Sequence, residues 1–231
     1  MKLHQTPCCS TLARIGNAPE LLLQRVRECA APEQRARLEG FIGASFAERH
    51  GARIRHFMPD LLALCDAAGR FRAAIGVRDA AGGPLFLERY LDLPVEAHIE
   101  RMHGAPVARG RIAEVGNLAA LGTGHSRLLI VALTDLLIAE GFEWVVFTAT
   151  AEVANSFQRL ALAPLVIGTA DPARMGDERD DWGRYYDCSP RVMAGAIRGG
   201  YDTLTARGVF RQVGHQALYG AQCGGVHAAV A

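Results

Sequence analysis

Apolar residues recur at helical spacing in four stretches of the chain and gather into short β-rich runs between them. The helical stretches cover residues 32–51, 94–102, 125–141 and 152–162. Each stretch repeats its apolar positions every three or four residues, and a glycine ends the first and the third. The pattern therefore predicts four helices with one buried face each.

Short runs rich in apolar and β-branched residues predict strands over 61–65, 71–77, 85–91, 112–118, 142–150 and 165–168. The first two flank a glycine turn and predict a hairpin. In the third, Glu88 and Tyr90 fall on the same side, because side chains alternate along a strand. Hairpin strands followed by a strand–helix–strand unit predict an α/β fold built on a mixed sheet.

The two ends of the chain give weaker patterns. Residues 1–31 predict a loosely ordered N-terminal lead-in with one short amphipathic stretch over 21–26. From residue 199 the composition drifts to alanine and glycine, and a frayed C-terminal extension over 199–231 is the default expectation. The main domain is accordingly expected over residues 32–198.

Composition narrows the function classes. Half of the 231 residues are hydrophobic and 21% are charged, which is typical of a globular protein, and the net charge of +1 gives no case for nucleic-acid binding. No apolar run is long enough to span a bilayer, and the first residues lack the apolar core of a secretory signal. The six cysteines are scattered without a C-x-x-C pair, so we expect a reducing, cytoplasmic location. The eight histidines show no ligand spacing, so no metal site is expected.

One strand–turn–helix unit is suited to phosphate. It consists of the predicted strand over 112–118, the glycines Gly122 and Gly124, and the helix that follows. The glycines permit a tight turn and leave room for a ligand to approach the backbone. The first N–H groups of a helix lack helical partners, and the helix dipole adds partial positive charge there. The alternative is an ordinary connection that needs glycine only to turn.

Five motifs in order carry a resemblance to a known family. They are His56–Pro59, Leu85–Asp92, Glu114–Ala119, Gly141–Thr150 and Trp182–Tyr186. Together they resemble the thermostable hemolysin family, which is in turn similar to the GNAT acyltransferases and their acyl-homoserine-lactone synthase branch. The resemblance implies a central, mixed, mostly antiparallel, twisted sheet flanked by helices. It also implies that the sheet splays open to admit the pantetheine arm of an acyl donor.

The implied function is transfer of an acyl group from a phosphopantetheine thioester to a small amine or amino acid. The donor, either acyl-CoA or an acyl carrier protein, would lie along the central strand with its phosphates on the glycine turn. The residues expected to bind it are Val115, Leu118, Gly122, Thr123, Gly124, His125 and Ser126. Ala119 stands where GNAT enzymes carry glutamine or arginine, which keeps the carrier protein open as donor. A second copy of the chain is a further candidate partner.

The same resemblance suggests roles for polar residues. Glu114 would be the general base, or else part of an ion pair. Asn117, or the backbone N–H groups of 115–118, would hold the oxyanion, although Asn117 equally suits a turn. Tyr185 or Tyr186 would protonate the leaving thiolate, with core packing as the alternative. Glu88, Tyr90 and Thr148 are candidate substrate-binding residues, and otherwise ordinary strand residues.

Two other functions remain open from the sequence. Gly124-His125-Ser126-Arg127-Leu128 begins like the G-x-S-x-G elbow of serine esterases, with Leu128 where the motif requires glycine. The family name suggests a membrane-active hemolysin. The sequence contains no basic amphipathic helix with a bare apolar face and no alternating hairpin of membrane-spanning length. Lysis through an acylated, detergent-like product would reconcile the family name with an acyltransferase.

Overall fold

A computed structural model describes residues 10–27 and 32–219 and centres them on one nine-stranded sheet. The strand order is β7-β8-β6-β5-β4-β3-β2-β1-β9, and all neighbours are antiparallel except β5 and β6. The strands are β1 Ser10–Ile15, β2 Leu21–Arg27, β3 Asp60–Cys65, β4 Phe71–Asp79, β5 Ile112–Ala120, β6 Trp144–Ala149, β7 Leu165–Thr169, β8 Arg191–Ala196 and β9 Gln216–Ala217. The expected mixed, mostly antiparallel sheet is confirmed.

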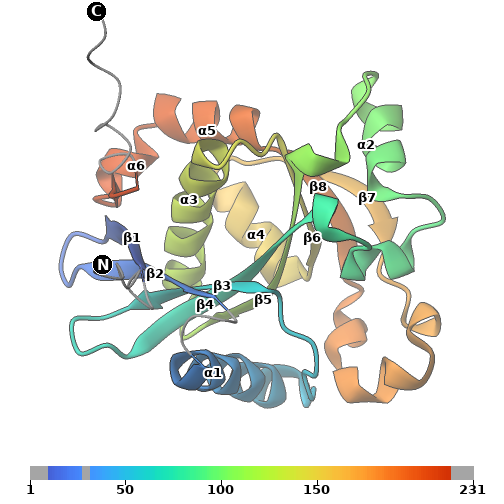
Figure 1. The fold of residues 1–231 in the computed structure, drawn as a ribbon, viewed down its shortest axis with the longest axis horizontal. Helices are drawn as coiled ribbons and strands as arrows, with labels where there is room; N and C mark the ends of the chain where they lie inside the picture. Colours follow the sequence, from blue (N-terminus) through green and yellow to red (C-terminus); the bar gives the residue numbers. More distant parts are fainter. Residues whose placement is uncertain (1–9, 28–31, 220–231) are drawn as a thin grey trace, which may run out of the picture.

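Helices cover both faces of this sheet. Figure 1 shows α1 (Pro32–His50) on one face and α3 (Thr123–Ala139) and α4 (Ala151–Arg159) on the other. The remaining helices are α2 Val95–His103, α5 Ile197–Ala206 and α6 Val209–Gln212. Short 3₁₀ segments complete the chain: η1 Ala80–Gly82, η2 Phe86–Tyr90, η3 Arg109–Arg111, η4 Pro172–Trp182 and η5 Tyr185–Cys188.

The core lies on both sides of the central strands. On β3, Leu61 packs in the cluster that contains Leu38 of α1, whereas its neighbour Leu62 packs in the cluster that contains Leu129 of α3. Side chains alternate between the two faces of a strand, so a strand covered on both faces is apolar throughout. This explains why β3 reads as a continuous apolar run.

The pairing between β5 and β6 stops halfway along β5. The parallel register runs from Ile112 opposite Trp144 to Val115 opposite Phe147, while β5 continues to Ala120. A bulge interrupts its other pairing, with β4, between Ala74 and Gly76. Beyond Val115 the edge of β5 that faces β6 therefore has no neighbouring strand among the described residues. This is the opening in the sheet that the family resemblance implied.

The strand predicted over 85–91 is wrong. This run forms the 3₁₀ segment η2, and the backbone N–H groups of Phe86 and Leu87 donate to the side chain of Glu114 instead of to a neighbouring strand. Glu88 and Tyr90 consequently do not share a strand face. Strand β8, which lies between β6 and β7, was not predicted.

The ends of the chain are more ordered than expected. Within the predicted lead-in, residues 10–27 form the hairpin β1–β2, which pairs with β3 and extends the sheet. Helix α5 (197–206) begins two residues before the predicted extension and continues into it, and within the extension β9 pairs with β1. The expectations of a loose lead-in and a frayed extension are therefore wrong for the described parts, while residues 1–9, 28–31 and 220–231 lie outside them.

Truncating Leu23 tests whether the N-terminal hairpin belongs to the core. Leu23 of β2 is completely buried, so Leu23→Ala should lower the free energy of unfolding by about 2–5 kcal/mol in urea denaturation. Leu121→Ala is the matched control, because Leu121 is 59% exposed and should change stability by less than about 0.5 kcal/mol. Equal small effects of both variants would mean that the hairpin contributes little to the core.

Candidate active site

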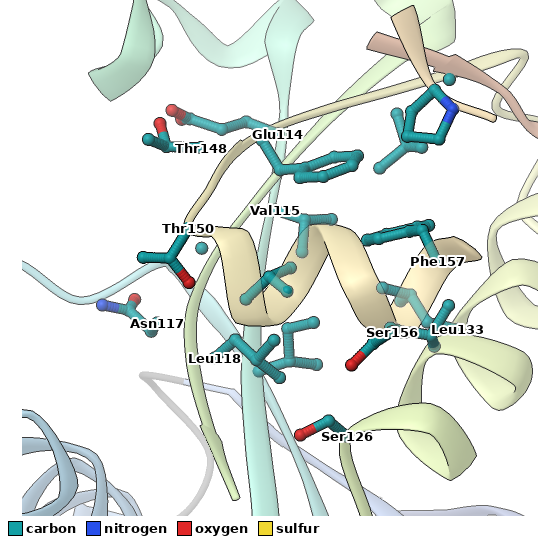
Figure 2. Close-up of a pocket in the computed structure, with 18 of the residues that line it drawn as sticks. Glu114, Val115, Asn117, Leu118, Ser126, Leu133, Thr148, Thr150, Ser156 and Phe157 are labelled. Carbon is teal, nitrogen blue, oxygen red and sulfur yellow. The ribbon is translucent and has the colours of Figure 1, made fainter. Parts of the chain in front are cut away.

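A cavity of about 440 Å³ lies at the open edge of β5. Residues of α1 and residues of α3 both line it, and these helices cover opposite faces of the sheet, so the cavity passes through the opening beside β5. In Figure 2, Glu114, Asn117, Thr148 and Thr150 lie toward one side of the pocket, and Leu133 and Phe157 lie toward the other. Its volume is in the range usual for small-molecule sites.

Arg49, near the end of α1, bridges the polar mouth of the cavity. Its Nη2 donates to the carbonyl oxygen of Ala120 at 2.6 Å, and its Nη1 lies 3.4 Å from a carboxylate oxygen of Glu152 on α4. The N–H of Leu121 donates to the carbonyl of Arg72 at 3.0 Å. Bonding directions alternate along an antiparallel strand, so the backbone groups of Ala120 point away from β4. Arg49 thus occupies an acceptor on the open edge of β5.

The segment that carries Tyr185 is held against the end of α1. The N–H of Arg184 donates to the carbonyl of His50 at 2.7 Å. Gly183 adopts φ +51°, and a Cβ there would lie 2.3 Å from that same carbonyl oxygen. Only glycine fits this approach. The rings of His50 and Tyr185 then meet edge to face, 5.3 Å apart, in the lining of the cavity.

His50 brings a titratable ring into the cavity. Burial lowers its pKa below the ordinary histidine value, and Arg49 lowers it further, while Glu152 acts in the opposite direction. The imidazole is therefore mainly neutral at neutral pH and can accept a proton.

Glu114 lies at the last paired part of β5 and is 1% exposed. Its two carboxylate oxygens accept the N–H groups of Phe86 at 3.1 Å and Leu87 at 2.8 Å, and Arg78 lies 3.8 Å away. Burial raises the pKa of Glu114 above the ordinary value, although the two N–H donors act in the opposite direction. A carboxylate has about four lone-pair sites, so acceptor capacity remains on this group.

Asn117 occupies the bulge and fixes a loop. It has φ +53°, and its Oδ1 accepts the N–H of Met58 at 2.9 Å while its Nδ2 donates to the carbonyl of His56 at 3.2 Å. Met58 lies over the paired glycines Gly76 and Gly116, where an added Cβ would come within 2.5 and 2.7 Å of its side chain. Asn117 therefore acts here as a bulge residue that orients residues 56–58, and its role as an oxyanion donor stays a prediction.

The tyrosines separate into two positions. Tyr185 lines the cavity and is buried, which raises the pKa of its hydroxyl, with a further contribution from Tyr186. It therefore remains protonated at neutral pH. Tyr90 also lines the cavity, and its hydroxyl is hydrogen-bonded to that of Tyr186 at 2.7 Å. Tyr186 is not part of the lining.

Glu88 lies apart from the cavity lining. Its carboxylate pairs with Arg109 at 2.7 Å and accepts the N–H groups of Leu85 and Val95. Burial alone would raise its pKa, but the guanidinium and the two N–H donors lower the pKa of Glu88 to about 2. Its carboxylate holds η2 against the start of α2. We expected Glu88 to bind substrate because residues 85–91 were predicted to form a strand beside the site. These residues form the 3₁₀ segment η2 instead.

The start of α3 separates the main cavity from a second one. Gly122 caps the helix with no side-chain hydrogen bond, and its carbonyl accepts the N–H groups of His125 and Ser126. Ser126, Val115 and Leu118 line the main cavity. His125 instead lines a second cavity of about 520 Å³, together with Arg70 and Arg72.

The donor-binding residues predicted from sequence are thus only partly brought together. Gly122 and Gly124 line neither cavity, and a Cβ at Gly124 would meet nothing within 4 Å. The side chain of Thr123 lies outside the described part of the chain. The Nδ1 of His125 is buried without a hydrogen-bond partner among the described residues. Burial lowers the pKa of His125, and Arg72 adds to the effect.

Ser126 does not form an esterase triad. Asp135 of α3 is hydrogen-bonded to the Nε2 of His215 at 2.7 Å, which gives the chain order Ser, Asp, His of α/β-hydrolases. Asp135 and Ser126, however, are nine residues apart on one helix, or about 13 Å along its axis. Ser126 also has no hydrogen bond to a histidine in the described part of the chain. His227 lies outside that part.

The described residues contain neither a metal-binding cluster nor a membrane-spanning helix. There, no group of three or more histidine, cysteine, aspartate or glutamate side chains could hold a metal ion. In the same residues, no helix is both long enough and apolar enough to span a membrane.

Sequence reasoning missed several residues at the mouth of the cavity: Arg49, His50, Arg78 and Glu152. Charged residues on amphipathic helices usually form a solvated face, and no local signal separates these from the rest. The placement of Arg49, His50 and Glu152 depends on where the end of α1 meets β5 and α4, whereas Arg78 lies on β4 and is placed opposite Glu114 by the β4–β5 register. The approach of the Gly183 segment to the end of α1 is part of this missing tertiary information.

Replacing Gly183 tests this approach. Gly183→Ala should destabilise the protein by at least about 1 kcal/mol more than Gly176→Ala, because its Cβ would overlap the His50 carbonyl. Gly176 is a matched control in the same region, since it has a similar φ of +54° but open space around it. Urea denaturation gives both values, and equal losses would mean that only backbone strain matters at Gly183.

Solved structures with a similar fold include enzymes that transfer acyl groups. The N-acyl amino acid synthase FeeM from uncultured soil microbes is 16% identical, with a TM-score of 0.53 over 83% of this chain and 93% of that one. The CoA-dependent acyl-homoserine lactone synthase BjaI is 13% identical, with a TM-score of 0.53 over 84% and 89%. A yellow fever mosquito protein described as a putative arylalkylamine N-acetyltransferase is 10% identical, with a TM-score of 0.51 over 83% and 96%. At these identities the likeness shows the fold alone.

The sequence itself matches one family. No curated protein has a detectably similar sequence. The model of the family described as thermostable hemolysin matches residues 29–201, a span that runs from just before α1 into α5. Because the match covers most of the chain, this protein belongs to the thermostable hemolysin family.

Proposed function

We propose that the protein is an acyltransferase that moves an acyl group from a phosphopantetheine thioester to a small amine or amino acid. The observation that carries the proposal is the open edge of β5 beside a cavity that crosses the sheet. Backbone groups on an unpaired strand edge bind extended amide-containing ligands by adding them as a further strand. Pantetheine is such a ligand, because it contains two amides in an extended arm.

The donor's phosphates bind at the start of α3. The first N–H groups of this 17-residue helix have no side-chain cap, and Gly124 leaves open space there. Helix N-termini attract anions through these N–H groups and the helix dipole. Arg70 and Arg72 line the second cavity at the same end of the helix and add positive charge.

The acyl chain occupies the apolar side of the cavity. Buried side chains of Ile130, Leu133, Phe147 and Ile197 line that side. Removing an alkyl chain from water is favourable at about 0.8 kcal/mol for each buried methylene. The thioester carbonyl is then held near the bulge at Asn117, where the pairing of β5 is interrupted.

The acceptor binds at the polar mouth, where Arg78 and Glu114 lie 3.8 Å apart. Glu114 removes a proton from the acceptor's ammonium group, and its raised pKa makes it a stronger base than an ordinary carboxylate. The free amine attacks the thioester carbon, a new C–N bond forms, and the C–S bond breaks. Tyr185, held protonated by burial, supplies the proton to the leaving thiolate, and the resulting tyrosinate takes up the second proton that the attacking nitrogen loses as the amide forms.

The comparisons support this class of reaction without testing its details. The structural neighbours include an N-acyl amino acid synthase and a lactone synthase determined with SAM and isopentyl-CoA. Both combine an acyl group with a small amine-containing molecule. The choice between coenzyme A and a carrier protein can be made by thermal shift, because a ligand stabilises the folded state by RT ln(1 + [L]/Kd).

Glu114→Gln should lower turnover by about 10²-fold or more, since a neutral amide cannot take up the ammonium proton. In the wild type, kcat/KM should fall as pH drops through the raised pKa of Glu114, because only the carboxylate form acts as base. The kcat/KM of the variant should not show this decrease at low pH. Because Glu114 also holds η2, unfolding free energies must be compared, and an unchanged rate in a folded variant removes Glu114 from the role of base.

Gly124→Leu should raise the Kd for acyl-CoA at least tenfold, because the side chain would cover the first N–H groups of α3. The fold should remain intact, since a Cβ at Gly124 meets nothing within 4 Å. Gly40→Leu is the matched control, because Gly40 lies in α1, also has open space, and lies outside both cavities. Unchanged affinity in Gly124→Leu would show that the phosphates bind elsewhere.

A further inference from the structure

The main cavity has a second end. Ala161, Ala163, Ala196 and Gly199 line it and are exposed to solvent. They belong to the connection after α4 and to the junction of β8 and α5. At the mouth, Arg49, His56 and Glu152 are likewise both lining and exposed. Between the two ends the lining includes buried side chains such as Ile75, Leu137 and Phe147. The cavity is therefore a passage with a polar and an apolar opening.

The surface of the passage near the second opening is apolar, although two of the residues that line it are threonines. Thr134 of α3 donates its hydroxyl to the carbonyl of Ile130 at 2.9 Å, and Thr203 of α5 donates its hydroxyl to the carbonyl of Gly199 at 2.8 Å. Hydroxyls that bond within their own helix leave the methyl groups as the exposed surface of the side chain. This part of the passage accordingly suits an alkyl chain.

Two adjacent glycines stand at this opening, in the first turn of α5. Glycine is the poorest helix former after proline, so a pair within a ten-residue helix calls for a reason. Neither has a positive φ, and a Cβ at Gly199 meets nothing within 4 Å. A Cβ at Gly200 would make only ordinary contacts, 3.5 Å from Leu162 and 3.9 Å from Thr134. Close packing does not require the glycines, and their effect is to keep the passage open between α3, α5 and the connection after α4.

We infer that the protein selects long acyl chains whose far end leaves through this second opening, and that Gly200 determines the upper length. The inference rests on the proposed function, because it takes the donor's thioester to lie at the mouth. The passage follows α4 from Glu152 to its end at Arg159, where the turn to Leu162 begins. These seven helical steps span about 10 Å. An extended chain advances about 1.2 Å for each bond, so about nine carbons reach the opening.

Equilibrium binding of saturated acyl-CoAs from four to eighteen carbons to the full chain tests the inference. Affinity should rise up to about fourfold for each added methylene, as expected for burial of apolar surface. It should then level off at about nine carbons, where the chain enters solvent. A steep loss of affinity beyond some length would mean a closed cavity, and affinity independent of length would mean no alkyl site. Either result overturns the inference.

Gly200→Leu should convert the plateau into a cut-off. The larger side chain would bridge toward Leu162 and Thr134, so the affinity for fourteen carbons relative to six should fall at least tenfold. Gly200→Ala and Gly200→Val give a graded series in case the leucine variant does not fold. Gly40→Leu, at an exposed helical glycine that is not part of the lining, should leave the length profile unchanged. An unchanged ratio across the folded members of the Gly200 series contradicts the inference.

Free fatty acids of the same lengths separate this inference from the proposed function. If they show the rise, the plateau and the cut-off in Gly200→Leu while acyl-CoA releases no thiol with any amine, the passage is correct and the thioester chemistry is wrong. If acyl transfer occurs but neither series depends on chain length, the proposed function stands and the passage does not bind the chain.

Discussion

The structure depends on where the pairing of two central strands ends. The parallel pairing of β5 and β6 ends after Val115, although β5 continues to Ala120. Backbone N–H and C=O groups must find partners, and an unpaired edge inside a protein is costly unless something else binds it. The bulge at Asn117, the loop over 56–58 and the end of α1 all gather at this edge. The cavity exists because no strand fills the gap.

The surrounding residues keep this gap open at defined positions. Glu114 accepts two backbone N–H groups from η2 and thereby anchors the wall next to the last paired residues. On the opposite side, Arg49 joins the carbonyl of Ala120 to Glu152 of α4. Gly183 allows the Tyr185 segment to lie against His50. These polar contacts surround the mouth, whereas apolar side chains of α3, α4 and α5 form the inner part.

Sequence patterns predicted the helices and strands whose formation depends on residues within one segment of the chain. Helices α1 and α3 and strands β3 to β5 follow from apolar periodicity and glycine stops. The family resemblance, not a local pattern, led to Glu114, Val115 and Leu118, which do line the cavity. The run over 85–91 predicts a strand because it is apolar, but the N–H groups of Phe86 and Leu87 donate to the carboxylate of Glu114, which is 28 and 27 positions away. The hairpin β1–β2 and the roles of Arg49 and His50 likewise depend on contacts with distant segments, which a sequence pattern does not contain.

The central claim is that a thioester donor adds to the open edge of β5. A crystal structure with the dodecyl thioether of coenzyme A, which cannot react, examines it directly. The account predicts the pantetheine arm alongside residues 116–120, with hydrogen bonds to the backbone of β5 and the alkyl chain between α3, α4 and α5. A ligand bound elsewhere, with side chains filling the space between β5 and β6, would contradict it.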